Sequence, residues 1–161
     1  MKIEPHILIF DTGPLWELVL YRAVHNLSFE KLNSELHHLT TVASYDNFSR
    51  FVASFSQKTT SPHVVAEISS KVIRTAKHGQ EDIWTMVYNE FSAMGMDEKT
   101  IELLQMPKEL VAKLGAVDVS VLELGSSFAP GSSIILSIDN TLIAECNRAG
   151  FSAKHLYEAI A

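Results

Sequence analysis

Two apolar stretches of the chain each end at an aspartate, and a helical pattern begins directly after each one. Asp11 follows residues 6–10, and Asp139 follows residues 133–138. Short continuous apolar runs are typical of strands buried in a parallel sheet. Such sheets bind ligands beyond the carboxyl ends of their strands, which lie about 4.8 Å apart. If these two strands are neighbours, Asp11 and Asp139 form a carboxylate pair that Mg²⁺ or Mn²⁺ would bridge.

Each acidic residue in these settings also has an ordinary structural explanation. Aspartate is among the best N-cap residues, and Asp11, Asp118 and Asp139 all precede helical patterns. Glu67 lies in the second turn of a helix that begins at Pro62, away from its apolar stripe, where a solvated glutamate is common. The local patterns therefore leave both interpretations open, a ligand or a structural residue.

The remaining chain alternates between helical and extended patterns. Helices are predicted over residues 14–24, 28–38, 45–55, 62–77, 80–94, 118–125 and 140–149, and strands over 6–10, 133–138 and 152–156. Residues 101–104 fit either a short strand or a helical turn. Strands that alternate with helices predict an α/β fold with a mainly parallel sheet and right-handed crossovers.

Length and composition limit the class of protein. The 161 residues fit one domain, and an apolar share of 47% is enough for a sizeable core. Cys146 is the only cysteine, which excludes an internal disulfide and a cysteine-based zinc site and fits a reducing compartment. We expect a cytoplasmic protein without a signal peptide, because its first apolar run is short. We also expect no membrane association, because no stretch approaches roughly 18 apolar residues.

The net charge of −6 argues against nucleic-acid binding through bulk positive charge. It is compatible with an enzyme whose carboxylates are partly neutralised by bound divalent cations. Other sites have less support from the pattern. His37 and His38 are expected on different sides of a helix, at the surface or its boundary. His63 and Glu67 share a helix face but lack a third zinc ligand, and Cys146 is expected to be a packing residue.

Four sequence motifs together resemble the PIN-domain nuclease family. The matching stretches are residues 7–12, 61–68, 114–118 and 136–142, and they contain Asp11, Glu67, Asp118 and Asp139 in that order. The resemblance implies a three-layer α/β/α sandwich in a single domain over residues 1–161, with a helical insertion at about residues 28–58. It also implies that the four acids are catalytic and surround one or two Mg²⁺ or Mn²⁺ ions at the carboxyl edge of the sheet.

The function implied by this resemblance is metal-dependent hydrolysis of RNA phosphodiester bonds, as in the toxin of a toxin–antitoxin module. The expected partners are an RNA substrate, an antitoxin or operon partner and a second copy of the chain. Thr12 and Ser137 are expected to orient carboxylates or a reacting water, although hydroxyls at turns also serve in capping and packing. The candidates for phosphate contact, each also explicable as a solvated residue, are Lys71, Arg74, Lys113, Arg148 and Lys154.

One departure from the family pattern suggests an alternative function. Many relatives carry a second acid directly after the fourth strand, where this chain has Asn140 beside Asp139. An amide oxygen can coordinate a cation but brings no charge. The alternative is therefore a catalytically weak PIN fold that binds RNA or a protein partner.

Overall fold

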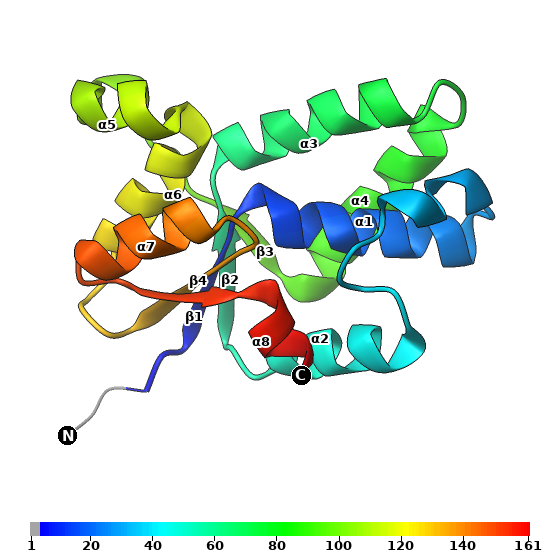
Figure 1. Ribbon diagram of the computed structural model, residues 1–161, viewed down its shortest axis with the longest axis horizontal. Coiled ribbons are helices and arrows are strands. Elements are labelled where there is room, and N and C mark those ends of the chain that lie inside the picture. Colours follow the sequence, from blue (N-terminus) through cyan, green and yellow to red (C-terminus); the bar gives the residue numbers. More distant parts are fainter. Residues whose placement is uncertain (1–3) are drawn as a thin grey trace.

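A five-stranded, all-parallel sheet forms the centre of the computed structural model, which describes residues 4–161 (Figure 1). The strands are β1 (Ile7–Phe10), β2 (Gln57–Thr60), β3 (Met96–Glu98), β4 (Ser133–Ser137) and β5 (Ser152–His155), in the spatial order β3-β2-β1-β4-β5. Every residue of β1 and β4 is buried. The two strands predicted from apolar runs are therefore the central strands, which are covered on both faces.

Helices cover both faces of the sheet and make a three-layer α/β/α sandwich, which confirms the predicted fold class. The helices are α1 (Thr12–Asn26), α2 (Val42–Ala53), α3 (Pro62–Thr75), α4 (Gln80–Met94), α5 (Lys108–Leu114), α6 (Ala116–Ser126), α7 (Asn140–Arg148) and α8 (Leu156–Ile160), with 3₁₀ helices η1 (Glu30–Glu35) and η2 (Leu103–Gln105). In Figure 1, α1, α3 and α4 lie on one side of the strands, and α6 and α7 lie on the other. No helix among residues 4–161 has the length and apolar character that a membrane crossing requires.

The strand order reverses between β1 and β4. The chain adds β2 and β3 on one side of β1, then crosses back to place β4 and β5 on the other side. Phe10 pairs in register with Leu136, so the residues that follow β1 and β4 leave the sheet together. This is the topological switch point, the position at which open α/β sheets bind ligands.

Local sequence signals account for most of the helices. The Ser61 hydroxyl accepts a hydrogen bond from the Val64 backbone N–H, and Pro62 is the first helical residue of α3, as the Ser-Pro pair predicted. The helix predicted over residues 45–55 begins earlier, at Val42, because Thr41 and Ser44 form a capping box. The helix predicted from Asp118 also begins earlier, at Ala116.

The prediction of a helix over residues 28–38 is wrong. Ser28 has φ +58°, a left-handed conformation that ends the preceding turn, and only η1 follows. Leu32 and Leu36 are nevertheless buried, so their spacing reflects burial and not an α-helix. The predicted helical insertion at 28–58 thus contains η1, a loop, α2 and the first residues of β2. His37 and His38 lie at a bend in this loop, so their predicted helical setting is also wrong.

Four elements have no counterpart in the sequence-based prediction. These are β2, β3, α5 and α8. Residues 101–104, which fitted either a strand or a turn, contribute to η2. β3 is a short edge strand and its last two residues are exposed, so it carries no apolar run that a sequence pattern would reveal.

Candidate functional site

Asp11 lies at the switch point of the sheet and is only 5% exposed. It occupies the N-cap position of α1, but its side chain makes no capping hydrogen bond. Its Oδ2 instead accepts a hydrogen bond of 2.6 Å from the Ser137 hydroxyl on β4. The interpretation of Asp11 as an ordinary helix cap is therefore wrong, and its carboxylate is directed across the sheet.

Ser137 connects Asp11 with the segment that carries Asp139. The Ser137 Oγ also accepts a hydrogen bond of 2.9 Å from the Asp139 backbone N–H. The exposed Asp139 carboxylate caps α7, because its Oδ1 accepts from the backbone N–H groups of Thr141 and Leu142 at 2.7 and 3.2 Å. The cap interpretation is confirmed for Asp139, and both capping bonds use the same carboxylate oxygen.

Glu67 reaches the same edge of the sheet from α3. The buried Thr12, the residue after Asp11, donates a hydrogen bond of 2.6 Å from its Oγ1 to Glu67 Oε2. Glu67 is half-buried, so the interpretation of it as a solvated surface glutamate is wrong. The hydroxyls of Thr12 and Ser137 thus each hold one carboxylate.

Asp118 lies in the first turn of α6. The N-cap of this helix is Gly115, so the expectation that Asp118 caps the helix is wrong. Burial is the main cause that raises the pKa of Asp118, to about 7. The negative charges that raise it further belong to Asp11, Asp139 and Glu67. Asp118 is therefore close enough to the other three acids for their charges to act on it.

The pKa of Asp11 is raised as well. Burial is again the largest cause, and the charges of Glu67 and Asp139 add to it. The Ser137 hydroxyl and the Thr12 backbone oppose this rise, because their hydrogen bonds stabilise the carboxylate. The four acids, which we call the acidic cluster, therefore share one electrostatic environment.

The donor chemistry of the acidic cluster fits a divalent cation. Among residues 4–161, no three His, Cys, Asp or Glu side chains are already arranged as a metal site. Burial is nevertheless joined by mutual repulsion in raising the pKa values of Asp11 and Asp118, and a bound cation relieves such repulsion. Carboxylate oxygens are the ligands that Mg²⁺ and Mn²⁺ prefer.

The five basic candidates make contacts elsewhere. Lys113 and Arg148 each form an ion pair of 2.5 Å with Glu145. The other three make weaker contacts with neighbouring side chains or backbone. The ammonium groups of Lys71 and Lys154 lie 5.9 and 5.8 Å from the ring centroids of Trp16 and Phe51, and Arg74 Nε donates to the Ser70 carbonyl. Asn140 is the exposed first residue of α7.

Two other candidate residues have settings that do not suggest catalysis. Cys146 is fully buried, and burial raises the pKa of its thiol to about 12, so the expected packing role is confirmed. His63 lies one turn before Glu67 on α3, as expected. Its Nδ1 is buried and has no hydrogen-bond partner in the described part of the chain.

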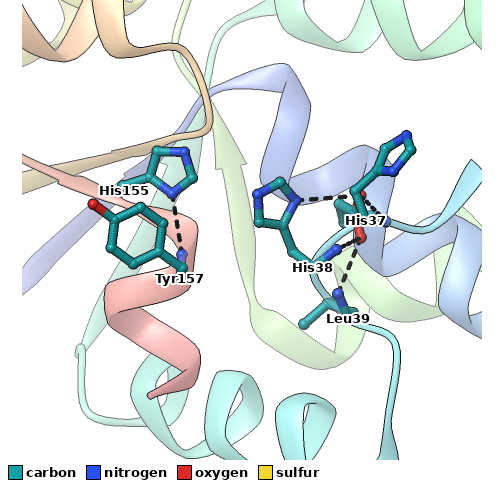
Figure 2. A network of polar contacts seen from close by, with 6 residues as sticks. His37, His38, Leu39, His155 and Tyr157 are labelled. Carbon is teal, nitrogen blue, oxygen red and sulfur yellow. Dashed lines mark hydrogen bonds and ion pairs between the residues drawn. The ribbon is translucent and has the colours of Figure 1, made fainter.

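Glu17 is a buried acid that the sequence analysis did not single out. It lies in α1 and is 3% exposed. Its carboxylate accepts hydrogen bonds from three consecutive backbone N–H groups, those of His37, His38 and Leu39, at 3.0, 3.1 and 3.1 Å (Figure 2). The available signal was a single acid surrounded by apolar residues in a predicted helix.

We expect Asp118→Asn to change how the free energy of unfolding depends on pH when EDTA is present. A carboxyl whose pKa is higher in the fold than in the unfolded chain costs stability as the pH rises from about 4 to about 7. The amide removes this loss, which we put at about 1 to 2 kcal/mol after allowing for solvent screening of this half-exposed group. Urea unfolding at pH 4.5 and pH 8 measures it.

The matched control is Asp97→Asn, which changes an exposed aspartate on edge strand β3. Its unfolding free energy should follow that of the wild type at both pH values. If Asp118→Asn loses as much stability as the wild type between these pH values, the fold does not raise the pKa of Asp118.

The structure brings the four predicted acids to one edge of the sheet. Asp11 and Asp139 follow adjacent strands, and Glu67 and Asp118 come from the first two turns of α3 and α6. No family model matches the chain, and no curated protein matches it. The functional interpretation therefore depends on the chemistry of this edge.

Proposed function

We propose that the protein is a metal-dependent nuclease that hydrolyses RNA phosphodiester bonds at the acidic cluster. The observation that carries this proposal is the convergence of four carboxylates at the switch point. There burial first, and the charges of the other three acids second, raise the pKa of Asp118 to about 7. Carboxylates that lie close together without a neighbouring positive charge lower the stability of the fold. Their presence together at the edge of the sheet where ligands bind therefore favours a functional role. We assign Asp11, Glu67, Asp118 and Asp139 as the ligands of Mg²⁺ or Mn²⁺.

The resemblance to PIN-domain nucleases supports the same assignment. The expected fold class agrees with the sheet and its helical layers, and the four motifs occur in the expected order. On this resemblance we also propose RNA as the substrate, a homodimer, and a role as the toxin of a toxin–antitoxin module in the cytoplasm. A basic antitoxin segment would complement the acidic cluster electrostatically.

The residues of the acidic cluster have separate tasks in the proposed reaction. A divalent cation, when bound, supplies a Lewis acid that activates water near neutral pH and stabilises negative charge on the phosphate. Ser137 holds the Asp11 carboxylate through its hydroxyl, and Thr12 holds that of Glu67. These hydrogen bonds fix the orientation of two carboxylates before any ligand arrives.

Asp118 has a distinct role because its pKa, raised to about 7, leaves its carboxyl partly protonated at neutral pH before a cation binds. Cation binding requires a deprotonated carboxylate, so it should release this proton at neutral pH. Asp139 is oriented by the N-terminus of α7, to which its Oδ1 is bonded. The cluster therefore contains both pre-oriented carboxylates and one that responds to ligand binding.

Calorimetric titration with Mn²⁺ at pH 7 tests the assignment. We expect the wild type to bind Mn²⁺ and release protons, seen as heats that differ between buffers of different ionisation enthalpy. The amide variants Asp11→Asn, Glu67→Gln, Asp118→Asn and Asp139→Asn should each bind at least about tenfold more weakly. Asp97→Asn is the control and should bind as the wild type does. Unchanged affinity in Glu67→Gln and Asp118→Asn would contradict a four-residue site.

A catalytically weak binding module is the second candidate function. Two observations favour it: Asn140 adds no charge beside Asp139, and one oxygen of Asp139 is already engaged in capping. RNA incubated with the protein distinguishes the two functions. Cutting that requires Mn²⁺ and stops in EDTA supports the nuclease, whereas RNA binding that persists in EDTA but gives no product even in Mn²⁺ supports the module.

A further inference from the structure

Three aromatic side chains lie together at the carboxyl edge of the sheet, and we call them the ring cluster. They are His38, His155 and Tyr157 (Figure 2). The ring centroids of His38 and His155 are 5.4 Å apart, and those of His155 and Tyr157 are 4.2 Å apart with planes inclined by 33°. These spacings are those of packed aromatic rings.

The ring cluster is one strand away from the acidic cluster. His155 ends β5 and pairs in register with Ser137 of β4. The same Ser137 donates to Asp11 and accepts from the Asp139 backbone N–H. A chain segment bound over the carboxylates would therefore pass close to the rings.

Hydrogen bonds position the His155 ring and the backbone of His38, whereas the Tyr157 side chain is exposed. His155 Nδ1 accepts from the Tyr157 backbone N–H at 3.2 Å, which fixes the ring at the start of α8. Glu17 binds the backbone around His38, and the Glu17 Oε1 lies 3.5 Å from His38 Nδ1. His155 is only 8% exposed, whereas Tyr157 is 57% exposed and lies against it. An exposed aromatic ring supported by a fixed imidazole forms a stacking platform.

The negative charge of the protein suggests what the stacking platform would contribute to nucleic-acid binding. The chain carries a net charge of −6, and Lys113 and Arg148 are paired with Glu145. Lys154, the residue before His155 on β5, has its ammonium group 5.8 Å from the ring centroid of Phe51. Binding of a polyanion therefore needs a source of affinity other than phosphate neutralisation. The accepting Nδ1 keeps His155 neutral, so its environment suits the face of a nucleobase better than a phosphate.

We propose that His38, His155 and Tyr157 form a stacking subsite for one unpaired base of the nucleic acid that is cut at the acidic cluster. This inference rests on the proposed nuclease function. A base can stack on a protein ring only after it leaves its own stack, so the bound nucleotide must be unpaired. Stacking accepts any base, so the subsite should contribute affinity and not sequence preference.

Fluorescence anisotropy with a labelled single-stranded RNA, in EDTA to prevent cutting, tests the subsite. Tyr157→Ala should weaken binding about tenfold, whereas Tyr157→Phe retains the ring and should bind within about twofold of the wild type. The matched control is Tyr88→Ala, which removes a tyrosine of α4 that is 70% exposed and should not change binding. The salt dependence of binding should be the same in Tyr157→Ala as in the wild type, because no phosphate contact is lost.

The same variants in Mn²⁺ separate this inference from the proposed function. Tyr157→Ala should raise KM for single-stranded RNA and leave kcat nearly unchanged. If the wild type cuts RNA but Tyr157→Ala has the same RNA affinity and the same KM as the wild type, the stacking subsite is wrong and the nuclease proposal is unaffected. Equal losses in Tyr157→Phe and Tyr157→Ala would also overturn it, because the hydroxyl and not the ring would then matter. A wild type that neither binds nor cuts RNA would overturn both proposals.

Discussion

Asp11→Asn is expected to cut RNA about a thousandfold more slowly than the wild type in Mn²⁺ and to be more stable in EDTA. The lost rate corresponds to about 4 kcal/mol of transition-state stabilisation, because the variant lacks the most buried carboxylate of the acidic cluster. The gain in stability has a separate cause. The raised pKa of Asp11 means that its charged form destabilises the fold increasingly above about pH 4, and an amide carries no charge.

Two measurements on the same preparation check this prediction. Single-turnover cutting of RNA at pH 8 gives the rate, and urea unfolding at pH 8 in EDTA gives the stability. Asn keeps a side-chain oxygen that can accept the hydrogen bond from Ser137, so the contact across the sheet is preserved. Asp97→Asn should match the wild type in both. A variant with slow cutting and reduced stability would indicate that Asp11 serves the fold and not the reaction.

Glu17→Ala should lower the free energy of unfolding by about 3 to 5 kcal/mol. The substitution removes the acceptor of three backbone N–H groups, which would be left without partners beside α1. In a domain of this length such a loss lowers Tm by about 10 °C. Differential scanning calorimetry at pH 7 measures it.

Two further variants define the cause of this loss. Glu17→Gln conserves shape, but its amide NH₂ would face N–H donors, so we expect more than half of the same loss. Glu35→Ala, at an exposed position of η1, should change the unfolding free energy by less than about 0.5 kcal/mol. A loss below about 1 kcal/mol in Glu17→Ala would mean that water replaces the carboxylate and that the buried network contributes little.

The sequence predicted the strands that are buried on both faces and the helices that begin with a clear capping signal. β1 and β4 are covered on both faces, so their apolar runs identify them, and α3 has a cap and a proline at its start. β2 and β3 were missed because their sequences, QKTT and MDE, carry no apolar run. Their hydrogen-bond partners are distant in the chain, and local propensity does not report such pairing.

The acids of the candidate site were found through their motifs, but the groups that hold them were only partly predicted. Thr12 and Ser137 were expected as orienting hydroxyls, and each contacts a carboxylate. Glu17 and the ring cluster depend on a loop without regular structure and on contacts between distant segments. No periodicity in the sequence reports either of these, and the incorrect helix over 28–38 hid the segment that carries His38.

The position of β1 at the centre of the sheet affects how the protein is made. β1 leaves the ribosome before the strands that flank it, because Phe10 and Asp11 contact residues 50 and 126 positions later in the chain, on β2 and β4. Contacts of such sequence separation form slowly and only when both partners are available. A nascent chain that ends before β4 therefore has one unpaired edge of its first strand and lacks Ser137 and Asp139. If the protein cuts RNA, the ribosome must pass the codons of β4 and Asp139 before any cutting activity exists.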